Sequence, residues 1–167
     1  MLSYLFHPID IGARKDIPTL ENIYSSLSIT KDIFVNVGMK LQKIPIICTT
    51  LYERCFVHLL KGTVKIRLYD PSQSKHLYRD FQKKMKCLKN TTNCFYNSKI
   101  NLTSEADVIN TNFPNYEDAF FTEVLLREGN LMYIPNFWWF TLEYKEDSVC
   151  LFYTSNTVIS YLYNKIY

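Results

Sequence analysis

The fold is decided by the stretch EGNLMYIPNFWWF, which occupies residues 128–140. Gly129 permits a tight turn into a strand, and Pro135 ends that strand because proline cannot donate a hydrogen bond within a sheet. Trp138 and Trp139 begin the next strand, and consecutive side chains of a strand point to opposite faces. We therefore expect one tryptophan to fill the interior while the other covers the outside. Plain core packing is the alternative role for both side chains.

Short apolar runs lie on both sides of this stretch. Residues 55–60 and 64–69 flank a turn at Gly62, and this arrangement predicts a hairpin. Further strands are expected at 33–37, 44–50, 122–126, 131–134, 138–144 and 149–154. Many short strands with closely spaced turn signals predict an all-β barrel or double-sheet roll with one or two short helices.

Two segments between these strands have a different character. Residues 78–89 carry apolar side chains at helical spacing, with Lys83 and Lys86 on the opposite, basic face. They predict a short helix. Residues 90–119 are rich in Asn, Thr, Ser and Asp and predict a long loop. A short helix is also expected near residues 22–28, and a helix or strand at 157–167.

Residues 128–140, together with FVHLLKGTVKIRLYDP at 56–71 and SKHLY at 74–78, resemble the cupin-like JmjC hydroxylases. The likeness is strongest to the branch of the asparaginyl hydroxylase that acts on hypoxia-inducible factor. That branch has a strand, "KG", a strand ending in proline, and later "GD-x-x-YIP-x-x-WWH". The resemblance implies one domain with a double-stranded β-helix, or jelly-roll, core at 32–156, a lead-in at 1–31 and a tail at 157–167.

Members of this family are iron(II)- and 2-oxoglutarate-dependent oxygenases, which hold the metal by two histidines and one carboxylate. Counting back from the Lys-Gly pair at residues 61–62, the family's H-x-D pair falls on Thr49 and Leu51. The distal histidine falls on Phe140, and the lysine that anchors the cosubstrate falls on Val64. The resemblance therefore implies that the metal ligands and the cosubstrate anchor are absent, and we expect no metal and no cofactor.

A search without any fixed register leads to the same expectation. His7, His58 and His76 are not followed two residues later by Asp or Glu, and no histidine occurs after His76. His58 has the parity of an outward-facing strand residue. Glu53 and Cys55 have inward parity, but neither has partners at ligand spacing. Cys55 is therefore interpreted as a small buried apolar residue.

Composition excludes several classes of protein. The chain has 167 residues, 47% hydrophobic and 16% aromatic, with a net charge of +3, which does not require a nucleic-acid partner. The four glycines are scattered, which excludes phosphate-binding glycine loops. Five cysteines without a CxxC pair favour reduced thiols and a cytoplasmic location, and we expect no membrane span. Abundant Lys, Ile, Asn and Tyr suit an AT-rich genome such as that of a large DNA virus, which would place the protein in the host cytoplasm or the virion.

The leading hypothesis is a catalytically inactive JmjC/cupin-like protein that serves as a binding or structural module. Its interior is expected to be filled by Leu51, Val57, Phe140 and one tryptophan. An active oxygenase with unusual ligands, acting as a protein hydroxylase or demethylase, and a structural or host-interaction protein of a DNA virus are the alternatives.

A protein partner is expected to bind the polar loop at residues 90–116. Exposed aromatic side chains, Phe113 and Tyr116, would serve as anchors, and the basic face with Lys83 and Lys86 would assist them. A merely solvated loop is the alternative, and a homodimer is left open.

Overall fold

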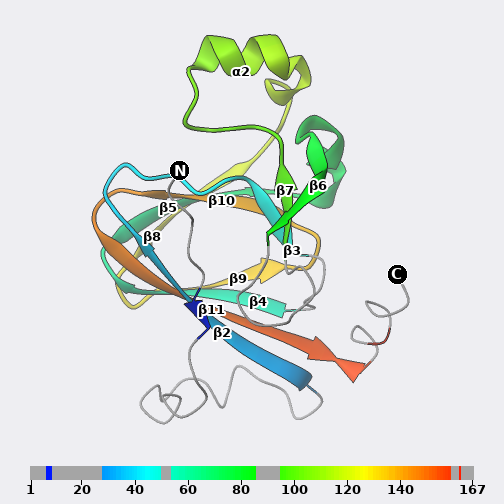
Figure 1. The fold of residues 1–167 in the computed structure, drawn as a ribbon. Coiled ribbons are helices and arrows are strands. Elements are labelled where there is room, and N and C mark those ends of the chain that lie inside the picture. Colours follow the sequence, from blue (N-terminus) through cyan, green and yellow to red (C-terminus); the bar gives the residue numbers. More distant parts are fainter. Residues whose placement is uncertain (1–6, 9–27, 50–53, 86–94, 159–161, 163–167) are drawn as a thin grey trace.

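The computed structural model describes residues 7–8, 28–49, 54–85, 95–158 and 162 (Figure 1). Within these residues, two antiparallel sheets face each other as a sandwich. Sheet A consists, in spatial order, of β1 (His7–Pro8), β2 (Ser28–Gly38), β11 (Ser148–Thr157), β4 (Arg54–Lys61) and β9 (Leu131–Pro135). Sheet B consists of β6 (Arg79–Met85), β7 (Phe95–Ser98), β3 (Ile47–Thr49), β10 (Trp139–Tyr144), β5 (Thr63–Tyr69) and β8 (Thr122–Arg127).

The chain alternates between the two sheets from β2 to β5 and again from β8 to β11, as in a jelly roll, whereas β5 to β8 all lie in sheet B. β4 pairs with β11 and β9 in sheet A, whereas β5 pairs with β10 and β8 in sheet B. The two strands predicted around Gly62 are therefore confirmed, but the prediction that they form a hairpin is wrong. Gly62, with φ +91°, carries the chain from one sheet to the other. A turn signal shows where a strand ends, but it does not show which strand becomes its partner.

The space between the sheets is filled by apolar side chains from alternate strand positions. On β10, Phe140, Leu142 and Tyr144 point into this core, and Trp138 packs against it. Trp139 lies on the outer face of sheet B, where its Nε1 donates to Ser74 Oγ at 2.8 Å. The expected division between the two tryptophans is thus confirmed.

Helices and loops cover the outer face of sheet B. The segment between β7 and β8 contains α2 (Ala106–Asn112) and the 3₁₀ helix η3 (Pro114–Tyr116), and another 3₁₀ helix, η2 (Pro71–His76), precedes β6. Figure 1 shows α2 beyond sheet B, on the side away from sheet A. The cluster beneath this layer contains Ile46, Cys48, Tyr69, Leu77, Ile100, Ile109, Ala119 and Trp139.

Two expectations about secondary structure are wrong. Residues 79–85 form strand β6, not the helix predicted at 78–89, and they pair with β7 across a register shift between Asp80 and Lys84. The apolar residues at 78, 81, 85 and 88 are three and four apart, a spacing that favours a helix, so the pairing of β6 with β7 has overridden the local pattern. The predicted loop at 90–119 contains β7, α2 and η3 from residue 95 onward. The helix expected near residues 22–28 and most of the tail at 157–167 lie outside the described residues.

Candidate functional site

The resemblance places the metal ligands at the interior ends of two neighbouring strands. Thr49 ends β3 and Phe140 lies in β10, and these strands pair so that Cys48 faces Trp139 and Ile47 faces Phe140. This pairing, together with the full burial of both side chains, confirms the expectation that Thr49 and Phe140 lie close together inside the sandwich. Leu51 lies outside the described residues.

Aromatic rings fill the interior around Phe140. The ring of Phe95 meets it edge-on with centroids 6.4 Å apart, and the ring of Phe152 stacks on it at 6.1 Å. Val57, another residue expected in the interior, is also fully buried there. Thr49 lies at the end of β3, the strand beside β10. Its hydroxyl oxygen, Oγ1, is buried and has no hydrogen-bond partner among the described residues.

The residue at the cosubstrate-anchor position also faces this core. Val64 is fully buried between the sheets, whereas its neighbour Lys65 points to the outer face of sheet B. The lysine is thus adjacent in sequence but on the opposite side of the strand, because side chains alternate.

Burial shifts the pKa of His58 and of the described cysteines toward the uncharged form. His58 is half-buried on the outer face of sheet A, with Nδ1 3.3 Å from the Tyr153 hydroxyl, and burial lowers its pKa. Its outward direction confirms the parity argument. Burial raises the pKa of three free thiols to about 12, so that they are poor nucleophiles and poor metal ligands: Cys48, Cys55 and Cys150. No group of three or more His, Cys, Asp or Glu side chains suited to a metal ion occurs in the described part of the chain.

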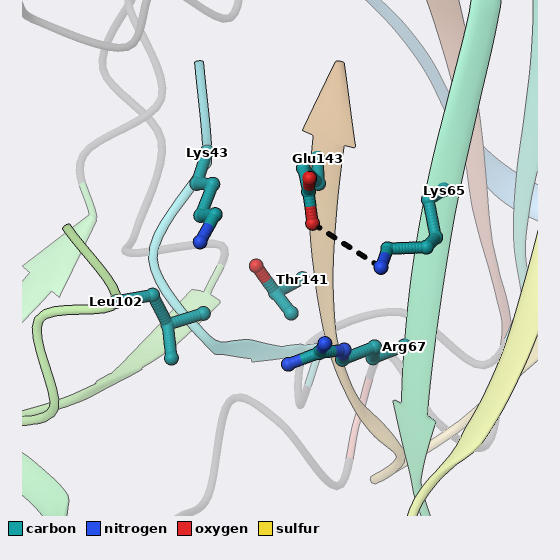
Figure 2. Close-up of a pocket in the computed structure, with 6 residues that line it drawn as sticks. All are labelled: Lys43, Lys65, Arg67, Leu102, Thr141 and Glu143. Atoms are coloured by element: carbon teal, nitrogen blue, oxygen red, sulfur yellow. Dashed lines mark ion pairs between the residues drawn. The ribbon is translucent and has the colours of Figure 1, made fainter. Parts of the chain in front are cut away.

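A small pocket, partly open to solvent, lies on the outer face of sheet B. Figure 2 shows its central residue, Thr141, between the side chains of Lys43 and Arg67. Thr141 Oγ1 donates to the carbonyl oxygen of Ile44 at 2.6 Å, so the hydroxyl is held in place. The residues that line the pocket are Lys43, Lys65, Arg67, Leu102, Thr141 and Glu143.

Ion pairs connect the charged side chains at one end of this pocket. Lys65 Nζ lies 3.4 Å from Glu143 and 3.2 Å from Glu123, and Arg67 Nε lies 3.0 Å from Glu123. Glu143 also pairs with Lys145. Burial opposes ionisation of Glu143, but the Lys145 hydrogen bond and nearby lysine charges outweigh it and lower the pKa of this carboxyl. Lys43 forms no ion pair with any residue that the structure describes.

The cupin-like domain family matches residues 54–166, which is more than half of the chain. The chain belongs to the cupin-like domain family. This result and the sandwich of antiparallel sheets confirm the expected jelly-roll fold. The branch suggested by the resemblance stays a prediction.

Solved structures similar to this cupin-like domain are remote in sequence. One is Peruvianin-I, a cysteine peptidase from Thevetia peruviana latex, with 12% identity, a TM-score of 0.41 and coverage of 75% of this chain and 48% of that one. Another is the CENP-C cupin domain of Drosophila melanogaster, with 9% identity, a TM-score of 0.40 and coverage of 74% and 56%. The chain spans about half the length of these structures. No curated protein matches it.

Of the residues predicted to bind a partner, the two aromatic ones are less exposed than expected. Phe113 is half-buried, with its ring edge-on to Tyr78 at 5.0 Å, and the Tyr116 hydroxyl lies 3.0 Å from that of Tyr69. The expectation that both are exposed is wrong, because they help to cover the outer face of sheet B. Lys83 lies in strand β6 and Lys86 lies outside the described residues. Partner binding by these residues stays a prediction.

Sequence reasoning missed the outer-face pocket. Lys65 and Arg67 on β5, and Thr141 and Glu143 on β10, are each two residues apart, and this spacing already places each pair on one face of its strand. The sequence does not show that β5 lies beside β10. This pairing places Arg67 opposite Thr141 and Lys65 opposite Glu143. Among the described helices, none is long and apolar enough to cross a membrane.

Proposed function

We propose that this cupin-like domain is a non-catalytic relative of the JmjC-type oxygenases and acts as a protein-binding or structural module. The observation that carries the proposal is the position of Phe140. At the place where the resemblance puts the distal histidine, a phenylalanine is fully buried between the rings of Phe95 and Phe152.

The donor atoms at the corresponding positions do not fit an iron(II) site. Such a site takes two imidazoles and a carboxylate. Thr49 supplies one neutral hydroxyl and Phe140 supplies no donor, and the third position is a leucine in the sequence. Val64 offers no charge to a cosubstrate carboxylate. His58 lies on the opposite face of its strand from the core, and the buried Cys55 thiol stays protonated at neutral pH.

The same substitutions have a structural advantage. Polar ligands without a metal would leave unpaired groups or trapped water between the sheets, and an unpaired buried polar group is unfavourable. Apolar side chains instead let the interior close, and Phe140, Val57 and Trp138 do so. In this proposal the former catalytic interior contributes stability, and binding takes place on the outer surface.

The catalytic part is tested by anaerobic reconstitution of the purified chain with iron(II), followed by metal analysis and an assay for succinate from 2-oxoglutarate. We expect iron far below one equivalent and succinate at the level of the blank. The single variant Phe140→His is expected to give the same result, since two further ligands are missing. Stoichiometric iron or succinate formation by the unaltered chain would support the alternative, an active oxygenase with unusual ligands.

The triple variant Thr49→His/Leu51→Asp/Phe140→His tests whether these positions are the right ones. If the register is correct, the folded variant should bind more iron than the unaltered chain, and circular dichroism shows whether it is folded. A folded triple variant that binds no more iron than the single variant would contradict the assigned positions. If the triple variant does not fold, Thr49→His/Phe140→His provides the same comparison with two ligands.

The binding part is tested by affinity capture from the native cells with the double variant Phe113→Ala/Tyr116→Ala. Because both side chains are half-buried, the melting temperature of the variant must be measured alongside. Phe120→Ala, at a side chain that is 79% exposed, is the matched control for loss of an aromatic ring. Loss of a partner by the folded double variant but not by the control would place the interface at η3. Retention of every partner by the folded double variant would exclude it.

A further inference from the structure

The outer-face pocket is separate from the cupin interior, although one strand serves both. Thr141 and Glu143 of β10 point into the pocket, whereas Phe140 and Leu142 point into the core between the sheets. A ligand in this pocket would therefore bind on the far side of sheet B from the former catalytic positions. Its binding does not depend on whether the interior is catalytic.

Positive charge exceeds negative charge in this pocket. Of the six described residues that line it, three are cationic and one is a carboxylate. That carboxylate, Glu143, is already paired with Lys65 and Lys145. Lys43 approaches Glu143 only as a neighbouring charge, without an ion pair within the described chain. The ion pairs along sheet B thus join Lys65 and Lys145 to Glu143, whereas Lys43 interacts with Glu143 only at longer range and forms no ion pair within the described residues.

Arg67 is held in place for a further contact. Its Nε pairs with Glu123, and its guanidinium group lies over the ring of Phe121, 4.7 Å from the centroid. A guanidinium group has five N–H donors, so the Nε contact alone does not exhaust it. A side chain that is already ordered loses less entropy when it binds a ligand.

The positions of the two cationic groups suit an oxyanion. In Figure 2 the Lys43 amino group and the Arg67 guanidinium group lie on different sides of Thr141, and Leu102 forms an apolar wall beside them. The Thr141 hydroxyl already donates its hydrogen bond to the carbonyl oxygen of Ile44. The hydrogen-bond donors for an anion therefore come from Lys43 and Arg67. We propose that this pocket binds a small oxyanion, the phosphate or carboxylate group of a small molecule, between Lys43 and Arg67, with the rest of the molecule against Leu102.

The test is a titration of the full chain, followed by amide NMR shifts, with two separate probes at pH 7: inorganic phosphate and succinate. Sodium chloride keeps the ionic strength constant, because exposed charges are screened by salt. We expect saturable shifts at residues around Thr141 with at least one probe. Saturation with phosphate alone identifies a phosphate site, and saturation with succinate alone identifies a carboxylate site.

Three variants with the same change in net charge make the test specific. Lys43→Gln and Arg67→Gln should each weaken binding about tenfold or more, as expected when a charged hydrogen bond is lost. Lys61→Gln, at an exposed residue of β4 in sheet A, should change the affinity less than about twofold. Arg67→Gln also breaks an ion pair, whereas Lys43→Gln does not, so the latter remains informative if the former fails to fold. Absence of saturation with both probes, or equal weakening by Lys61→Gln, would overturn the proposal.

Discussion

Replacement of Phe140 by alanine should remove a large part of the stability of this domain. The ring is 0% exposed and lies between the rings of Phe95 and Phe152, with centroids 6.4 and 6.1 Å away. Phe→Ala substitutions in protein cores cost about 3–5 kcal/mol, and the cost is higher where the surroundings cannot collapse into the cavity. Here the two neighbouring rings come from β7 and β11, strands of opposite sheets, and both are themselves fully packed. We therefore expect a loss of about 4 kcal/mol, a large fraction of the 5–15 kcal/mol typical of a domain.

Urea denaturation followed by far-ultraviolet circular dichroism measures this loss. With a slope of about 2 kcal/mol per molar urea, the midpoint should fall by about 2 M. Phe120→Ala is the control, because the same ring is removed from a side chain that is 79% exposed, and its effect should stay within about 0.5 kcal/mol. Loss of less than about 1 kcal/mol by Phe140→Ala, with an unchanged slope, would refute the packed interior on which the non-catalytic proposal depends.

Two further predictions concern the turns and the buried thiols. Gly62→Ala should lower the free energy of unfolding by about 1–3 kcal/mol through backbone strain, because φ at this position is +91°. A clash should lower it further, because the added Cβ atom would lie 2.8 Å from the Asp147 carbonyl oxygen. Gly129→Ala, with φ +81° and no atom within 4 Å of the added Cβ, should cost only the strain, so equal melting temperatures for the two variants would contradict the clash. Alkaline pH should destabilise the domain because three thiols are buried. Burial raises their pKa from 9.0 to about 12 in Cys48, Cys55 and Cys150. Between these values the unfolded chain has lost thiol protons that the folded chain retains, so the free energy of unfolding should fall as pH rises, by up to about 1.4 kcal/mol per thiol and pH unit. Urea denaturation at pH 8 and pH 10 measures this change in the free energy of unfolding. If Cys55→Ala shows the same change between the two pH values as the unaltered chain, the Cys55 thiol is not responsible.

Local patterns predicted the strands from β2 to β5 and from β8 to β11, together with the directions of several of their side chains. Pro135 ends β9, and Trp138 and Trp139 divide between the core and the outer face as alternation requires. The same parity argument correctly directed Cys55 inward and His58 outward. These features depend on neighbours in the sequence, so the sequence is sufficient to predict them.

Features that depend on distant pairing were not predictable in this way. The turn at Gly62 marked the end of a strand, but only the sheet order shows that β4 and β5 separate there. The outer-face pocket brings together Lys43, Arg67 and Leu102 from segments far apart in the chain. Even Phe113, in a polar segment, is half-buried because the outer face of sheet B offers an apolar surface that no local pattern reveals.

Strand β10 connects the two proposals physically. Its residues alternate between the apolar core, which receives Phe140, Leu142 and Tyr144, and an outer face that carries Thr141 and Glu143. A slip of one residue in its pairing would exchange these faces and bury Glu143, so the packing of Phe140 also determines where the pocket residues lie. Conversely, the pocket side chains of β10, Thr141 and Glu143, do not belong to the core cluster between the sheets. Selection can therefore alter the ligand on the outer face of sheet B without disturbing the fold, provided that the interior stays filled.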